Sequence, residues 1–279
     1  MSFPTVLLVH GAWHSPAHFE HLTTALEGHG FKTLTVALPS VHYDTQARPP
    51  PAELAADVEA IASVAQTELD SNPQTDIVLL GHSYGSLPAS CAIQSLDKPS
   101  RGRSGRANGI TALFAISGLL LPSGSSPWEM AGRQYPVQMS VSKHMFPDRS
   151  GNNGPDVEIV FTIPNDPPGP IHLLYHDVEA EEAERYAAML KPFVFNNHFS
   201  IVPYAGYLAV PTFYLLCSED HALPSAVQEM MVAGANADVE ANGGVASIQV
   251  TKIHSSHSPF LSRVAETADW IKASVDQMR

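Results

Sequence analysis

An apolar segment runs without a spacer into the pentapeptide GHSYG at residues 81–85, and a helix-forming segment follows at once. This G-x-S-x-G pattern is most informative when a buried strand precedes it and a helix follows it. Such a turn exposes the serine hydroxyl to a cleft and places the first free N–H groups of the helix beside it. Gly81 and Gly85 have no Cβ atom, which suits a turn where the strand and the helix cross so closely that a Cβ atom would clash. The segment therefore predicts a nucleophile, Ser83, although an idle serine in an ordinary strand-to-helix turn is the alternative.

Apolar segments that are expected to form strands alternate with expected helices along most of the chain. The expected strands cover residues 5–10, 33–38, 76–80, 110–116, 211–217 and 246–252, and the expected helices cover residues 17–27, 52–69, 84–96, 225–233 and 259–275. Strands that are apolar throughout and alternate with helices are typical of a parallel sheet with both faces covered. The 279 residues can therefore bury a full core in one domain of the α/β class.

The alternation is interrupted between residues 122 and 210. This segment is rich in Pro and Gly and contains 11 of the 22 aromatic residues of the chain. A loop of that length without secondary structure is uncommon, so the segment is expected to form a helical cap over the catalytic face, with helices near residues 127–139 and 178–189. Residues 1–121 and 211–279 then form the core. A helical layer remote from any site is the alternative.

A nucleophilic serine needs a base, which is expected in the loop after the last strand. That loop contains both His254 and His257. His257 lies just before a predicted helix and is the preferred base. His254 is expected at the end of the strand, where it can simply pack or bond to the backbone.

The base needs a carboxylate that holds its tautomer and stabilises the imidazolium. The loop after the strand at 211–217 offers Asp220 as the preferred acid and Glu219 as its competitor. The other place for an acid, residues 117–127, contains no carboxylate. The chain order of Ser83, Asp220 and the histidine is the order expected when a G-x-S-x-G turn carries the nucleophile.

The oxyanion that forms during attack by a serine needs two N–H donors. The main chain of Tyr84 is expected to supply one, and Ala12, in the loop after the first strand, is expected to supply the other. The His-Gly pair before Ala12 would by itself indicate only a tight turn. Trp13 and His14 either line the pocket or pack. The residues expected to contact the substrate are Trp13, His14, Trp128 and Tyr135.

The formal net charge of −13 and the pI near 5.4 argue against nucleic acid or an anionic membrane as a partner. The basic residues Lys98, Arg101, Arg103 and Arg106 lie in a Gly/Ser-rich stretch and are interpreted as a solvated loop rather than a binding patch. Histidines at helical metal-ligand spacing lack a Cys or clustered carboxylate, so no metal is expected, and no cofactor motif is present. The expected partner is a small-molecule substrate, and the protein is expected to be a monomer or homodimer.

The two cysteines, Cys91 and Cys217, lie in apolar surroundings and are expected to be buried free thiols, which suits a reducing compartment. Neither an apolar run of about 20 residues nor a signal peptide is evident. The expected location is therefore the cytosol.

Four stretches carry a family resemblance: VLLVHGAWHSPAHF, IVLLGHSYGS, VPTFYLLCSEDHALP and HSSHSPFL. They resemble the α/β-hydrolase superfamily, and more closely its single-domain branch of uncharacterised fungal and bacterial hydrolases, plant methylesterases and hydroxynitrile lyases. The similarity covers the chain except the cap and residues 97–109. It implies an α/β-hydrolase fold whose core is a six-stranded, mainly parallel sheet with helices on both faces. It also implies Ser-His-Asp triad chemistry, and hardly constrains the substrate.

Three functions fit these residues. The first is a serine hydrolase that cleaves an ester, thioester, lactone or activated C–C bond through an acyl-enzyme. The second is a lyase that uses the same triad as acid and base. Relatives that cleave cyanohydrins are expected to carry a Lys near the catalytic His and a Thr after the first-strand His, where this chain has Ser258-Pro259 and Gly11. The third is a ligand-binding protein on a hydrolase scaffold, which a complete triad disfavours.

Overall fold

The computed structural model describes residues 3–43, 50–147 and 156–279. Its centre is a six-stranded sheet in the order β2 (Thr33–Val36), β1 (Thr5–Val9), β3 (Ile77–His82), β4 (Ile110–Ile116), β8 (Thr212–Cys217) and β9 (Gln249–Ile253). Every neighbouring pair of these strands is parallel. The predicted parallel sheet is therefore confirmed, and each of the expected strands contributes to it.

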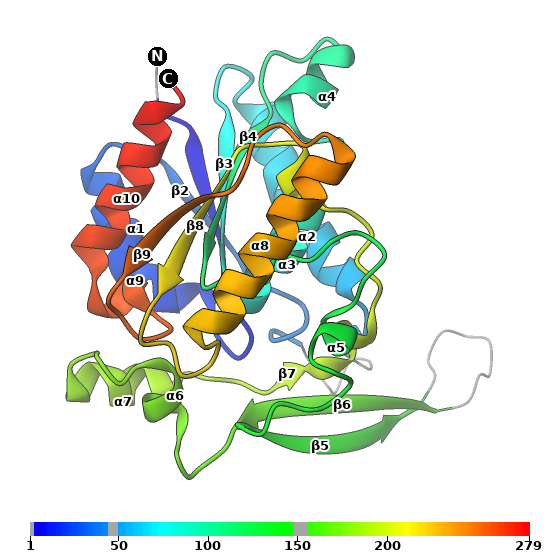
Figure 1. Ribbon diagram of the computed structural model, residues 1–279, viewed down its shortest axis with the longest axis vertical. Coiled ribbons are helices and arrows are strands. Elements are labelled where there is room, and N and C mark those ends of the chain that lie inside the picture. Colours follow the sequence, from blue (N-terminus) through cyan, green and yellow to red (C-terminus); the bar gives the residue numbers. More distant parts are fainter. Residues whose placement is uncertain (1–2, 44–49, 148–155) are drawn as a thin grey trace.

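Helices cover both faces of this sheet (Figure 1). One face carries α1 (Glu20–Gly28), α9 (Pro259–Ser262) and α10 (Val264–Gln277), and the other carries α2 (Leu54–Ser71), α3 (Ser86–Ala92) and α8 (Ser225–Asn242). Strand β2 is added on one side of β1, whereas β3, β4, β8 and β9 are added in turn on the other side. Crossovers between parallel strands are right-handed, so this reversal of direction places the connecting helices on opposite faces of the sheet. Strands β1 and β3 are buried at every residue, which explains their continuous apolar sequences.

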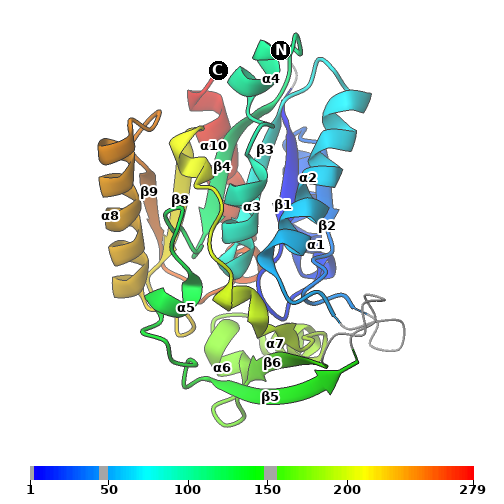
Figure 2. The same cartoon turned by 90° about the vertical axis from the view of Figure 1, so that its right-hand side faces the viewer.

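Most of the described part of the segment between β4 and β8 lies beyond the carboxyl ends of the sheet strands, whereas its last residues return along the core beside α3 and α8 (Figures 1 and 2). It contains the helices α5 (Pro127–Met130), α6 (Pro170–Leu174) and α7 (Ala180–Ala188), the strands β5 (Met139–Phe146), β6 (Val157–Pro164) and β7 (Phe193–Val194), and the 3-10 helices η3 (Phe195–Phe199) and η4 (Gly206–Leu208). The three strands form a separate antiparallel sheet. We call residues 122–210 the insertion.

The insertion is not the helical cap that was predicted, because it contains the sheet of β5, β6 and β7, although α7 does form where a helix was expected. The helix predicted near residues 127–139 is the single turn α5, because Gly132 and Arg133 adopt positive φ angles of 66° and 60° directly after it. Strand β6 then forms because Phe161 and its neighbours pack on Phe146 and on Tyr43 from the distant core. The periodicity of a local sequence cannot reveal a packing partner so far away along the chain.

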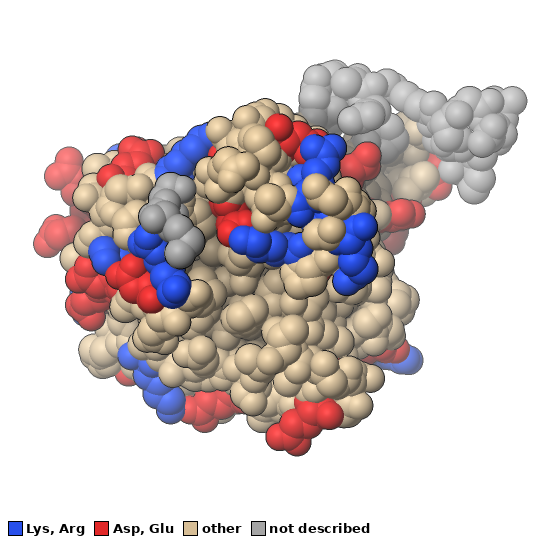
Figure 3. All heavy atoms as spheres, turned by 90° about the horizontal axis from the view of Figure 1, so that it is seen from above, with Lys and Arg blue, Asp and Glu red and all other residues tan. Residues whose placement is uncertain are grey.

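The basic stretch forms helix α4 (Lys98–Arg103) rather than the expected solvated loop. Arg101 is buried and pairs with Asp70 at 3.2 Å, and Lys98 Nζ pairs with Asp76 at 2.7 Å. In the view onto this end of the molecule, basic side chains lie beside acidic ones (Figure 3). These ion pairs neutralise part of the positive charge of the basic stretch.

Both cysteines are buried and free, as predicted. Burial raises the pKa of the Cys91 and Cys217 thiols to about 12, so neither is a ready nucleophile. Within the described ranges, His, Cys, Asp and Glu side chains do not come together in any set that suits a metal ion. None of the described helices has the length and apolar character needed to cross a membrane.

Candidate active site

Ser83 occupies a strained turn between β3 and α3. Its φ of 51° lies in the left-handed region, which a side chain adopts only when the surrounding structure enforces it. The flanking glycines are required by space: a Cβ atom on Gly81 would lie 2.4 Å from the Cα of Ser86, and one on Gly85 would lie 2.3 Å from the carbonyl oxygen of His10. The close crossing inferred from the G-x-S-x-G pattern is therefore present, and Ser83 lies at its tip.

His257 and Asp220 are in direct contact, although 37 residues separate them along the chain. The distance between His257 Nδ1 and Asp220 Oδ2 is 2.6 Å, and both residues are buried. The other oxygen of Asp220 accepts hydrogen bonds from the N–H groups of Ala222 and Leu223, each at 2.8 Å, and Gln228 donates to Oδ2 at 3.1 Å. These donors hold the carboxylate in place, and its Oδ2 accepts a hydrogen bond from the Nδ1–H of His257.

The two alternatives to these residues pair with each other at the surface. The His254 side chain is 80% exposed, and its Nδ1 lies 3.3 Å from Glu219. His254 lies just beyond the end of β9, as expected. The tertiary structure thus brings Asp220 to His257 and leaves Glu219 and His254 in solvent.

A cavity of about 340 Å³ brings Ser83 and His257 together beneath the insertion. Ala12, Trp13 and Tyr84 also line it, so five of the residues singled out in the sequence meet there. The remaining lining residues are Leu119, Pro127, Met130, Ala131, Pro136, Gln138, Met139, Leu173, Phe193, Phe195, His198, Ala222, Leu223, Val227 and Met230. Ten of these fifteen come from the insertion, and no Lys, Arg, Asp or Glu is among the described lining residues.

The loop after β1 approaches the nucleophile closely. A Cβ atom on Gly11 would lie 3.1 Å from Ser83 Cβ, which explains why glycine precedes Ala12. Trp13 has a φ of 65°, and its Nε1 donates to the carbonyl oxygen of Thr162 in β6 at 2.9 Å. This bond ties the loop to the insertion. The N–H of Ala12 forms no hydrogen bond with any described residue, so it remains available to a ligand.

Three residues expected to contact the substrate do not line the cavity. His14 is buried behind the loop, where its Nδ1–H donates to Ala12 O at 2.7 Å and its Nε2 accepts from Tyr175 OH at 2.8 Å. Burial keeps the pKa of His14 well below its ordinary value. Trp128 and Tyr135 pack against Phe195, with ring centroids 6.2 Å and 5.0 Å from its own. Their role here is to support the cavity wall.

Sequence reasoning named Trp13 and Tyr84 but missed three other aromatic residues that line the cavity. Phe193, Phe195 and His198 lie on β7 and η3, close together in the sequence. The enrichment of aromatic residues in the insertion pointed to the correct segment. It could not distinguish the inward-facing rings from the supporting ones, because that choice depends on how η3 packs against Tyr84.

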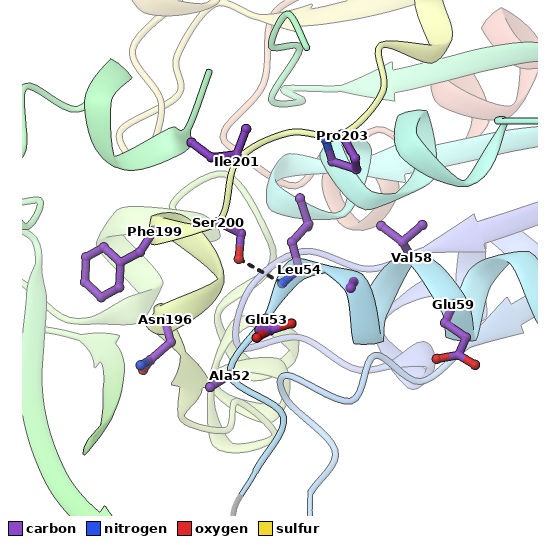
Figure 4. Close-up of a pocket in the computed structure, with 11 residues that line it drawn as sticks. Ala52, Glu53, Leu54, Val58, Glu59, Asn196, Phe199, Ser200, Ile201 and Pro203 are labelled. Atoms are coloured by element: carbon purple, nitrogen blue, oxygen red, sulfur yellow. Dashed lines mark hydrogen bonds between the residues drawn. The ribbon is translucent and has the colours of Figure 1, made fainter. Parts of the chain in front are cut away.

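A second, larger hollow of about 750 Å³ lies between the start of α2 and residues 196–203 (Figure 4). Apolar side chains such as Leu54, Val58 and Ile201 line it. Its serine, Ser200, accepts a hydrogen bond from the Leu54 N–H at 3.1 Å and therefore serves the start of the helix. No histidine or cysteine lines this hollow within the described residues, so Ser200 has no neighbouring base of the kind that His257 offers to Ser83.

Known proteins share both the sequence pattern and the fold. The chain is 24% identical to the alpha/beta hydrolase nvfD of Aspergillus novofumigatus over 93% of its own length and 91% of that protein. It is 26% identical to norfluorocurarine synthase 2 of a Strychnos species over the same shares of the two chains. The crystal structure of a polyneuridine aldehyde esterase mutant superposes with a TM-score of 0.73 at 19% identity, covering 98% of this chain and 99% of that one.

The model of the alpha/beta hydrolase family matches residues 6–270, which is nearly the whole chain. The match spans the strand-to-helix turn at Ser83, the loop with Asp220 and the loop with His257. The chain therefore belongs to the alpha/beta hydrolase family of enzymes.

Proposed function

We propose that this enzyme is a serine hydrolase in which Ser83 is the nucleophile, His257 the general base and Asp220 the carboxylate that orients the base. The 2.6 Å contact between His257 and Asp220 carries the proposal, together with the cavity that Ser83 and His257 share. The contact places a proton on Nδ1 of His257, so that Nε2 can accept the proton of the serine hydroxyl.

The reaction follows from these positions. Ser83 Oγ attacks the substrate carbonyl while its proton passes to His257 Nε2. The oxyanion accepts hydrogen bonds from the N–H groups of Ala12 and Tyr84. The tetrahedral intermediate then collapses, and the leaving group departs with the proton from His257. Water, deprotonated by His257, attacks the acyl-enzyme and releases the acid and free Ser83.

The lining of the cavity supports a substrate that is small to medium in size, uncharged and apolar or aromatic. Among the described lining residues there is no Lys, Arg, Asp or Glu that could pair with a charged group. Phe193 and Phe195 offer area for a flat ring, and Met130 and Met139 can adapt to its shape. The insertion then acts as the cap of the site, since these four residues belong to it. The resemblance to a polyneuridine aldehyde esterase is consistent with ester cleavage.

Labelling with a fluorophosphonate tests the nucleophile without knowledge of the substrate. We expect the unmodified protein to take up one label, the Ser83→Ala variant none, and the Ser86→Ala variant as much as the unmodified protein. Ser86 is a matched control because it lies in the same turn, is buried and its Oγ has no hydrogen-bond partner among the described residues. The measurement is intact mass after labelling. An unlabelled wild-type protein, or a labelled Ser83→Ala variant, would contradict an activated serine.

A series of esters tests the substrate class. We expect kcat/KM to rise from acetyl to phenylacetyl esters of one alcohol, because each added apolar group is buried in the cavity. A succinyl ester should be at least about tenfold poorer than the butyryl ester of similar size, because its carboxylate would lose water without gaining a partner. A preference for the succinyl ester would overturn the assignment of an uncharged substrate.

Neither alternative function gains support from the cavity. No Lys lies among its described lining residues, so the lysine expected of a cyanohydrin-cleaving relative has no counterpart. A pure ligand-binding role leaves the strained turn and the contact between His257 and Asp220 without a purpose. The labelling experiment decides against this third possibility if Ser83 reacts.

A further inference from the structure

The active-site cavity contains four polar side chains besides Ser83 and His257, and two of them are bonded within the protein. Trp13 Nε1 donates to the carbonyl oxygen of Thr162 at 2.9 Å. Tyr84 OH donates to Asp57 Oδ2 at 2.7 Å, and this carboxylate is completely buried. The remaining two are Gln138 and His198, whose side chains form no hydrogen bond with any described residue. These two are the polar groups that a substrate can engage away from the reacting carbonyl.

His198 is held rigidly in the cavity wall. Its ring stacks on Phe195 with centroids 4.2 Å apart and an angle of 11°, and on Tyr84 at 5.6 Å and 17°. Phe193 contacts it edge-on at 5.5 Å. All three of these aromatic residues line the cavity with His198. A ring fixed by such packing presents its free nitrogen at a defined place, which is a requirement for specific recognition.

The two nitrogens of His198 differ in their surroundings. Nδ1 is fully buried without a hydrogen-bond partner among the described residues, whereas the residue as a whole is only partly buried and Nε2 is not one of its buried unpartnered atoms. Burial lowers the pKa of His198 to about 3, so the ring is neutral at physiological pH and carries one N–H and one lone pair. A buried N–H without an acceptor is rarer in proteins than an under-satisfied acceptor. The proton therefore belongs on Nε2, which makes His198 a hydrogen-bond donor.

We propose that His198 is a specificity-determining residue of this enzyme, whose Nε2–H donates a hydrogen bond to an uncharged oxygen on the ring-bearing part of the substrate. The oxygen is a carbonyl, ether or hydroxyl group, separate from the carbonyl that Ser83 attacks. The proposal rests on the hydrolase function proposed above and narrows its substrates to oxygenated rings. An anionic oxygen does not fit, since the neutral donor stands in a cavity whose described lining has no Lys or Arg.

A donor in a largely apolar cavity discriminates between ligands of the same shape. A substrate with an acceptor oxygen completes the bond, whereas a hydrocarbon of equal size leaves the donor without a partner. The loss of such a bond is expected to lower affinity by about tenfold. Gln138 can reach the same class of oxygen with its amide, but it lies in the turn before β5, where the neighbouring Val137 is exposed. His198 is therefore the group that sets the preference.

The test compares ethyl 4-acetylphenylacetate with ethyl 4-isopropylphenylacetate, which differ in the carbonyl oxygen and hardly in shape. Binding is measured by calorimetry on the Ser83→Ala variant, so that hydrolysis is not required. We expect the acetyl compound to bind about tenfold more tightly than the isopropyl compound. Adding His198→Phe, which keeps a stacked ring and removes the N–H, should reduce this ratio to less than about threefold.

The control is His144→Phe, an exposed histidine on β5 outside the cavity, which should leave the ratio unchanged. Equal affinity for the two compounds, no binding of either, or a ratio that survives His198→Phe contradicts the role of His198. Retention of the preference in binding, with no turnover of either ester by the unmodified protein, would instead contradict the proposed hydrolase function. Failure of one proposal is thus distinguished from failure of the other.

Discussion

Replacement of His257 by alanine is expected to slow the reaction of Ser83 by about 10³-fold or more, whereas His254→Ala should leave the rate within about twofold of the wild-type value. His257 is buried and bonded to Asp220, while His254 is a solvent-exposed side chain. Without a base at His257, the serine must attack as a neutral hydroxyl, which is a weak nucleophile. The measurement is kcat for an ester together with the rate of fluorophosphonate labelling, which needs no substrate.

The acid provides a second matched pair for the same experiment. Asp220→Asn should lower the rate by about 10²–10⁴-fold, because the amide can stabilise the wrong tautomer of His257. Glu219→Gln removes a carboxylate from the adjacent position. Among the described residues this carboxylate bonds to His254 and Ser218 at the surface, so the effect of its removal should be small. A larger loss in Glu219→Gln than in Asp220→Asn would show that the acid has been assigned to the wrong residue.

The free energy of unfolding is expected to fall steeply as the pH drops below about 6.5, by about 5 kcal/mol per pH unit near pH 5. Five histidines cause most of this: burial lowers the pKa of His10 and of His198 to about 3 and of His18 to about 4, and holds those of His14 and His82 well below the ordinary value. Each takes up a proton in the unfolded chain near pH 6.5 and stays neutral in the folded protein. The free energy of unfolding therefore has its full value above pH 6.5. It decreases as the pH falls from 6.5 towards the pKa values of these histidines in the folded protein.

The hydrogen bonds of these histidines explain why protonation is opposed. His10 donates from Nδ1 to Gly11 O and accepts at Nε2 from the Leu38 N–H, an arrangement that needs the neutral ring. His14 likewise donates from one nitrogen and accepts at the other. Burial raises the pKa of the Asp57 carboxyl, which makes the folded protein more stable as the pH falls. This contribution opposes that of the histidines, but it involves at most one proton. Cooperative acid unfolding between about pH 4 and 6 follows.

Urea denaturation at a series of pH values measures this slope. The variant His254→Gln is the control, because the His254 side chain is exposed and its replacement should not change the slope. His10→Gln should reduce the slope by about 1.4 kcal/mol per pH unit, whatever its effect on stability at neutral pH. A free energy of unfolding that is constant from pH 7 to 5 would mean that these histidines are protonated in the folded state.

The parts of the molecule that depend on local sequence could be predicted without the structure. The strand, turn and helix around Ser83 follow from consecutive residues, because apolar side chains, two glycines and a helix-forming stretch act over one or two turns. The parallel sheet followed from the same kind of evidence, since strands buried on both faces must be apolar throughout. The loops that carry Asp220 and His257 could be placed for the same reason, because they directly follow two of those strands.

Pairings across the chain were decided by the tertiary structure alone. Asp220 and Glu219 are neighbours in the sequence, and the side chains of neighbouring residues point in different directions. Only the folded structure determines that the Asp220 side chain is the one that points to His257. The insertion formed a hairpin because Phe161 found partners in Phe146 and in Tyr43, far away in the sequence. The same packing placed His198 and Phe195 in the cavity wall and Trp128 and Tyr135 against Phe195. Composition identified this segment as aromatic, and only its folding against Tyr84 determined which rings face the substrate.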